Sequence, residues 1–145
     1  MAEVIPLEDV QSLFNSQWNI SNVAKPQLLI VNNTNQELLV EFRNRGDLVI
    51  FRPDSPALEE IPLGNHKYGN RSYNILSEIY TSTNRQKLYD LMGEIRRICH
   101  NQRHSMTNFQ RILYRNFVER SQEEDNIWHG QISIVLENVS IILDT

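Results

Sequence analysis

Residues 71–101 read RSYNILSEIYTSTNRQKLYDLMGEIRRICHN, and this stretch decides the fold because its hydrophobic period changes partway along. Up to residue 82 the apolar side chains alternate and fall on both faces: Tyr73, Ile75 and Ile79 on one, Leu76 and Tyr80 on the other. Alternation with both faces at least partly covered is typical of a central β-strand. We therefore predict such a strand over 71–82.

From residue 84 the period becomes helical. One stripe collects the apolar residues Leu88, Leu91, Met92, Ile95, Ile98 and Cys99. The residues expected to face water are Arg85, Lys87, Glu94, Arg96 and Arg97. This pattern predicts a long amphipathic helix over about 84–101.

The N-terminal part of the chain predicts a second helix and several strands. Pro6, with Glu8 and Asp9 in the following turn, indicates a helix from about Pro6 to Gln17. A β-prone run at 27–31 predicts a short strand. Two further runs predict a hairpin, at 37–43 and 48–52, joined by a four-residue turn that contains Gly46.

The segment from 53 to 70 shows little regular pattern. It contains the helix and strand breakers Pro53, Pro56, Pro62, Gly64 and Gly69. It is longer than most connections inside a compact domain. We predict an extended loop at about 53–70, and we regard the part from 54 to 70 as a candidate contact surface.

The C-terminal part predicts three strands. They lie at 109–118, where a helix is the alternative, at 127–137, and in a last short run at 139–143. Together these elements predict an α+β fold, with a mostly antiparallel sheet covered on one face by the long helix and the N-terminal helix. The length of 145 residues suits a single α+β domain over 1–145.

Composition narrows the class of protein. Lys and Arg number 14 against 18 Asp and Glu, so the net charge of −4 disfavours tight binding to a polyanion. The single cysteine, Cys99, excludes an internal disulfide, and the start of the chain lacks a signal-peptide pattern. No run approaches the roughly 20 apolar residues of a membrane-spanning helix. We expect a reducing compartment, the cytoplasm.

Candidate chemical sites are weak in this sequence. His100 and His104 have the spacing of two metal ligands on one helix, but no third ligand lies near them in sequence. Cys99 lies on the apolar stripe of its helix, which favours core packing over a nucleophilic role. No phosphate-binding loop, nucleophile elbow or zinc-type cysteine pair is present. We predict no catalytic, cofactor-binding or metal site, and hence no enzyme.

Two short motifs have simpler explanations. Residues 45–47 spell RGD, an adhesion signal in some secreted proteins, but the hairpin turn explains them. The glycosylation patterns at 19–21, 70–72 and 138–140 need a secretory compartment, for which we see no signal.

Arginines and aromatic residues are the remaining candidates for contact with a partner. The middle of the chain is locally basic through Arg85, Arg96, Arg97, Arg103, Arg111, Arg115 and Arg120. Phe51, Tyr68, Tyr114 and Trp128 lie near loops or strand ends, where aromatic residues serve either as interface anchors or as core.

From residue 71 onward, about half of the chain resembles the tail-terminator or tail-completion proteins of tailed viruses. The resemblance is carried by an alternating strand that ends in Thr81, Ser82 and Thr83, and by a helix opening with NRQKLY at 84–89 and continuing through EIRRI at 94–98. A further strand follows, and WHG at 128–130 opens the last one. These features are shared patterns and include no diagnostic motif.

The resemblance implies a structural virion protein. Such a protein forms a homo-oligomeric ring, usually a hexamer, that caps the tail tube protein and joins it to the head-proximal connector while DNA passes through the lumen. Its localisation would be the virion, after assembly in the host cytoplasm. Two alternatives come from the residues alone: a nucleic-acid-binding or processing protein that uses the Arg-rich region 85–120, and an enzyme whose site forms only between subunits.

Overall fold

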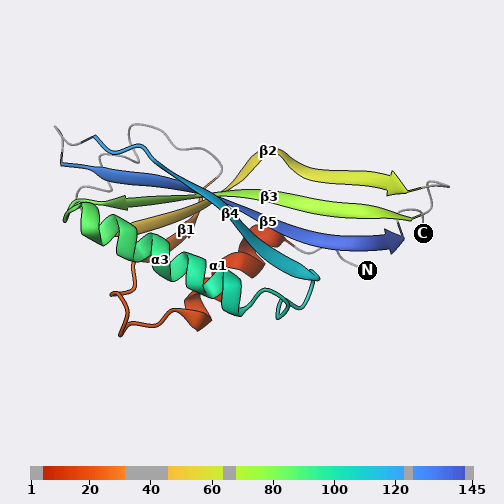
Figure 1. Ribbon diagram of the computed structural model, residues 1–145, viewed down its shortest axis with the longest axis horizontal. Helices are drawn as coiled ribbons and strands as arrows, with labels where there is room; N and C mark the ends of the chain where they lie inside the picture. Colours follow the sequence, from red (N-terminus) through yellow and green to blue (C-terminus); the bar gives the residue numbers. More distant parts are fainter. Residues whose placement is uncertain (1–4, 32–45, 64–67, 123–125, 143–145) are drawn as a thin grey trace.

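The computed structural model describes residues 5–31, 46–63, 68–122 and 126–142 (Figure 1). In chain order its elements are α1 (Pro6–Gln17), β1 (Gln27–Ile30), β2 (Leu48–Leu63), β3 (Tyr68–Thr81), α3 (Arg85–Asn101), β4 (Arg111–Glu119) and β5 (Trp128–Ile142). The strands form one sheet in the order β1-β2-β3-β5-β4. Only the β1–β2 pair is parallel. The prediction of an α+β fold with a mostly antiparallel sheet is confirmed.

Both predicted helices form, and local sequence explains where they begin. In α1, Pro6 lies at the first helical position and Glu8 and Asp9 in the first turn, next to the positive end of the helix dipole. In α3, the Asn84 side chain caps the helix by accepting a 2.7 Å hydrogen bond from the Lys87 N–H. The predicted boundaries of both helices are confirmed.

The main core lies between the sheet and the two helices, which pack on the same face (Figure 1). The helices bury Val10 and Phe14 of α1 and the predicted stripe of α3. The sheet contributes alternate residues of its strands: Val49, Phe51, Ile75, Ile79, Ile132, Ile134 and Leu136. Leu48, Ile50, Tyr80 and Ile127 form a smaller cluster on the opposite face. The prediction that β3 is a central strand with two covered faces is therefore confirmed.

The predicted loop at 53–70 is wrong. Within the described residues, 53–63 continue strand β2 and 68–70 begin β3, and the two strands pair from Leu58↔Tyr73 to Leu63↔Tyr68. The prolines misled the prediction because a proline cannot donate a backbone hydrogen bond inside a ladder. Here Pro53, Pro56 and Pro62 lie on a strand whose outer side carries β1 only along Leu48–Phe51, so the missing donors cost little.

Two further predictions need correction or fall outside the described part. The run 37–43 of the predicted hairpin lies outside the described residues, and 48–52 begins β2. The run at 139–143 is no separate strand: up to residue 142 it continues β5, because Glu137 and Asn138 still pair with β3 and leave no break. No helix among the described residues is long and apolar enough to cross a membrane.

The packing of α3 generates a stability prediction. Ile95 is fully buried against the sheet, whereas Arg96, the next residue, is exposed. We expect Ile95→Asp to destabilise the protein by at least about 4 kcal/mol, because an unpaired carboxylate enters the core. Arg96→Asp is the matched control and should stay within about 1 kcal/mol. Thermal unfolding followed by circular dichroism measures both, and an Ile95→Asp variant as stable as the control would contradict this packing.

Candidate assembly surface

The sheet is longer than the helices that cover it. Figure 1 shows β2, β3 and β5 running on together past the helices. We call β2 residues 58–63, β3 residues 68–73 and β5 residues 136–142 the arm, whose base at Tyr73 and Leu136 still packs against the core. The arm is antiparallel throughout. Its outer edge on β2 pairs with no strand among the described residues. The arm thus presents backbone donors and acceptors as well as side chains.

Among the side chains that the structure describes in the arm, Leu58 and Ile61 are large, apolar and exposed. Leu58 is 53% and Ile61 is 58% exposed, and because they lie three residues apart on one strand they point to opposite faces. Polar pairs hold the strands in register: Arg71 bonds Glu60 at 2.9 Å on the face of Leu58, and Asn74 donates to Glu59 at 2.8 Å on the other face. The arm is therefore an ordered sheet with apolar groups on both sides of its edge.

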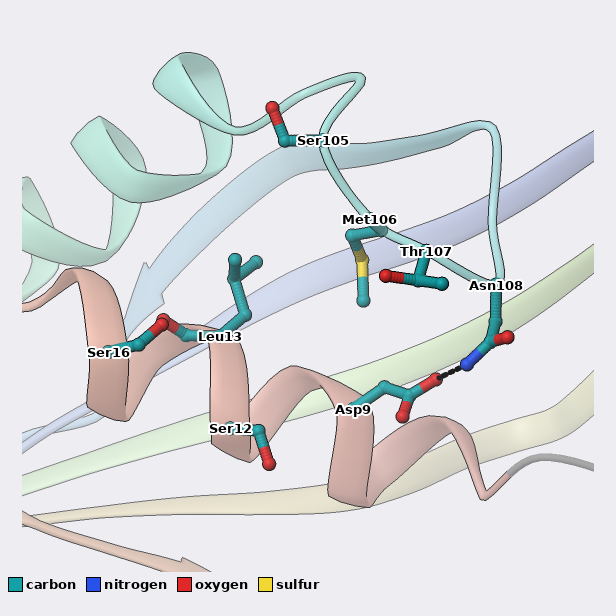
Figure 2. A pocket seen from close by; sticks show the side chains of 8 residues that line it. All are labelled: Asp9, Ser12, Leu13, Ser16, Ser105, Met106, Thr107 and Asn108. Atoms are coloured by element: carbon teal, nitrogen blue, oxygen red, sulfur yellow. Dashed lines mark hydrogen bonds between the residues drawn. The ribbon is translucent and has the colours of Figure 1, made fainter.

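A pocket of about 310 Å³ lies at the base of the arm, on the helix side. Its apolar walls are Pro6, Leu58, Tyr73 and Phe109, and its polar lining is Glu60, Arg71, Asn108 and Asn138. A second, more polar hollow of about 510 Å³ lies between α1 and the segment that leads from α3 to β4 (Figure 2). Asn108 lines both, and its side chain donates a 2.8 Å hydrogen bond to Asp9.

The opposite edge of the sheet is strand β4, and it too carries exposed apolar groups. Val118 is 45% exposed, and it pairs across the ladder with Gln131 on the face away from the helices. Tyr89 of α3 is 40% exposed on the helix side of the same strand, where it packs edge-on against Phe117. The hydrogen bond that Tyr89 donates to Glu119 raises the pKa of the phenol.

A row of hydrogen-bonded polar side chains crosses the sheet on the face away from the helices. The sequence pattern did not predict this row. The buried carboxylate of Glu78 accepts hydrogen bonds from Arg52 at 3.0 Å and from Gln131 at 2.9 Å. Gln131 in turn accepts a 2.7 Å bond from Arg120 on β4. These bonds tie β2, β3, β5 and the end of β4 together.

His129 and Tyr80 flank this row. Their rings stack with centroids 4.1 Å apart, and His129 Nε2 lies 3.3 Å from a Glu78 oxygen. Burial, followed by the negative charge of Glu78, raises the pKa of Tyr80. A cluster of this kind was detectable in sequence only as an alternation of polar residues within apolar strands, since its members come from separate strands.

Glu94 is a second buried carboxylate, and the prediction that it faces water is wrong. Its side chain is 1% exposed and pairs with Arg97 at 2.7 Å. It also accepts hydrogen bonds from the Asn19 N–H at 2.7 Å and from the Asn22 amide at 3.0 Å. Helical periodicity could not reveal this role, because the groups that Glu94 holds lie in the segment between α1 and β1.

The candidate residues for chemistry are not brought together. Cys99 is buried in the core, and burial raises the pKa of its thiol to about 12, so little reactive thiolate forms. His100 and His104 are exposed, and the nearby groups are Tyr114 for the first and the Gln110 carbonyl for the second. Within the described ranges, no group of three His, Cys, Asp or Glu side chains is placed to hold a metal ion.

The basic region is largely neutralised by internal pairs. Arg85 pairs with Glu119, Arg97 with Glu94 and Arg111 with Glu137. Arg96, Arg103 and Arg115 are exposed and spread over α3, the segment after it and β4. The seven arginines therefore do not form one continuous cationic face.

The remaining candidates have structural roles where they are described. Of the RGD residues, Arg45 lies outside the described part, Gly46 has a positive φ of 79°, and Asp47 accepts a hydrogen bond from Thr81 and pairs with Lys87. Phe51 belongs to the main core, and Tyr114 packs against that core. The Arg85 guanidinium lies over the Trp128 ring, with its central carbon 5.1 Å from the ring centroid. The side chain of Tyr68 lies outside the described part.

Comparisons with known proteins give no relative: no family model matches this chain, and no curated protein matches it. The class that fold and surface define is an α+β domain whose sheet extends past its helical cover and whose two edges carry exposed apolar groups.

The Glu94 cluster generates a pH prediction. Burial raises the pKa of Glu94, but its hydrogen bonds with Arg97, Asn19 and Asn22 outweigh burial and the net shift is downward. A lowered folded-state pKa means that the stabilisation is complete above the unfolded value of about 4.3 and is lost as the pH falls through the folded value. Glu94→Gln should cost about 1–3 kcal/mol at pH 7.

Chemical denaturation between pH 7 and pH 3 measures this effect. The difference in unfolding free energy between wild type and Glu94→Gln should shrink as the pH falls, because the wild-type carboxylate becomes protonated. Glu8→Gln, on the exposed side of α1, is the matched control. A difference that does not change with pH would show that the charge of Glu94 has no part in holding the segment after α1.

Proposed function

We propose that this protein is a structural subunit that acts by assembling with copies of itself into a ring. The observation that carries the proposal is the arm, an ordered three-stranded extension whose outer edge pairs with no other described strand and carries the exposed apolar side chains Leu58 and Ile61. Exposed apolar side chains beside an edge strand do not stabilise a monomer, whereas a neighbouring subunit would bury the side chains and pair with the edge. The particular ring we propose is the tail terminator of a tailed virus, on the strength of the pattern in residues 71–130.

In this role the protein caps the tail tube and joins it to the head-proximal connector. The ring would be a hexamer, and DNA would pass through its lumen without specific binding. The net charge of −4 supports free passage, because a predominantly acidic subunit repels phosphates. The internal pairing of Arg85, Arg97 and Arg111 supports it as well, since paired guanidinium groups release fewer counterions from DNA. The ring needs no catalytic centre.

Nucleic-acid binding is the second candidate, and exposed Arg96, Arg103 and Arg115 favour it. These three side chains have no carboxylate partner among the ion pairs of the described residues. A protein that used them to grip DNA would bind with an affinity that falls steeply as salt rises.

The solution mass of the purified protein tests the proposal. Light scattering over a range of concentrations should give a closed species near six chains of 17.0 kDa, or a monomer that forms rings once tail tube is added. Duplex DNA titrated in a salt series should bind weakly or not at all. A protein that stays monomeric with and without tail tube and binds DNA tightly at low salt would overturn the ring and favour the second candidate.

A further inference from the structure

The two outer edges of the sheet are complementary in the side chains that they expose. The edge of the arm carries Glu59 and Ile61 on the face away from the helices, and the edge on β4 carries Val118 and Arg120 on the same face. On the helix side, the arm edge exposes Leu58, and Tyr89 of α3 is exposed beside β4, where it packs against Phe117. Among the described side chains, each edge thus has an exposed apolar group on or beside either face.

The charges at these edges are also complementary. Glu59 accepts a hydrogen bond from Asn74, and Arg120 donates one to Gln131. Within the part of the chain that the structure describes, both charged groups therefore bond to an amide rather than to an opposite charge. A carboxylate on one edge and a guanidinium on the other are free to meet across a contact between copies.

Strand direction and register agree with such a contact. β2 is antiparallel to β3, β3 to β5 and β5 to β4, so β2 and β4 run in opposite directions. When two copies stand side by side with the same face forward, β2 of one is antiparallel to β4 of the next. In an antiparallel ladder, a register that pairs Ile61 with Val118 also pairs Glu59 with Arg120.

The same register places Glu60 opposite Glu119 on the helix side. This contact is tolerated because each carboxylate keeps its own arginine, Arg71 for Glu60 and Arg85 for Glu119. Cross-strand pairs of apolar residues and of opposite charges each stabilise a ladder, whereas bare like charges would oppose it. The Ile61–Val118 and Glu59–Arg120 pairs thus favour this register. The like-charged Glu60–Glu119 pair is neutralised by the two arginines.

The register also sets a stagger between neighbours. Val118 stands level with Glu78 of β3, and Ile61 stands level with Asn70. The contact therefore displaces each copy along the strands by roughly 26 Å, against roughly 19 Å across the four strands β2, β3, β5 and β4 of one copy.

We propose that the outer edge of the arm on one copy pairs with the outer edge of β4 on the next copy, in antiparallel register with Ile61 opposite Val118 and Glu59 opposite Arg120. The inference rests on the proposed assembly and names the surface that makes it. The contact is heterologous, since two different edges meet, and its repetition gives a ring when the rotation between copies closes and an open filament when it does not. Its occupant is a second copy of this chain, because the chain itself carries both halves.

Two single variants and their mixture test the contact. Ile61→Asp and Val118→Asp should each fold, because both side chains are exposed, and each should weaken assembly at least about tenfold by placing a carboxylate in the apolar pair. Mixed in equal amounts, the two variants should form dimers and nothing larger. One intact arm edge and one intact β4 edge remain between them, which is enough for a single contact.

Ile20→Asp is the matched control. Among the described residues, Ile20 is the most exposed large apolar residue at 72%, and it lies between α1 and β1, away from both edges. This variant should assemble like the wild type. A loss of assembly in the control equal to that in Ile61→Asp would show that any exposed apolar group matters, and would overturn the assignment to the two edges.

A charge exchange tests the register. Glu59→Arg and Arg120→Glu should each weaken assembly, and the double variant should recover most of it, because the pair is restored with its signs reversed. Double-variant assembly no better than that of either single variant would overturn the register. These outcomes are separate from failure of the ring itself, which the wild type alone would reveal.

Disulfide cross-linking tests the same contact when the wild type associates only weakly. Ile61→Cys in one chain and Val118→Cys in another chain of different mass should give mainly the mixed disulfide on oxidation, since cross-strand partners lie within disulfide reach. The native Cys99 is buried and does not compete. Random proportions of mixed and like pairs, from a wild type that assembles, would overturn the contact while leaving the ring in place.

Discussion

The pairing of β3 with β2 on one side and β5 on the other is the constraint on which the rest of the structure depends. β3 pairs with a neighbouring strand on both sides from Tyr80, under the helices, to Tyr68, beyond them, with one register irregularity on each side. The helices α1 and α3 cover only part of this length (Figure 1). Because the ladder continues past the covered core, the molecule has an arm, and within the described residues no strand pairs with the outer edge of that arm.

Two buried carboxylates hold the elements of the helix-covered part of the fold in place. Glu78 joins strands across the open face of the sheet through Arg52 and Gln131, and Glu94 fastens the segment after α1 to α3 through Asn19 and Asn22. A buried charge is tolerated only when its hydrogen bonds are satisfied, so each cluster specifies one arrangement of the elements around it. The edges that we propose as contacts are held in place by these clusters.

Much of the fold could be predicted from the sequence, because the period of the apolar residues determines strand or helix locally. The strand at 71–82 and the helices at 6–17 and 84–101 follow directly from that period. The arm could not be predicted, since Pro53, Pro56 and Pro62 look like loop residues until the edge position of β2 is known. The sequence analysis placed the candidate contact surface in the segment 54–70, whereas the partner edge and register that we propose depend on strand order, which periodicity does not contain.

The central claim is that copies of this chain meet through the outer edges of the arm and of β4. Backbone amide hydrogen exchange in the assembled wild type and in the Val118→Asp variant tests it most directly. We predict slower exchange in the assembled protein at residues 59–63 and 116–120, with no change in β1 or at the exposed surface of α3, because new interstrand hydrogen bonds protect only the two edges. Equal exchange at both edges in the two samples, with protection appearing elsewhere, would contradict the account.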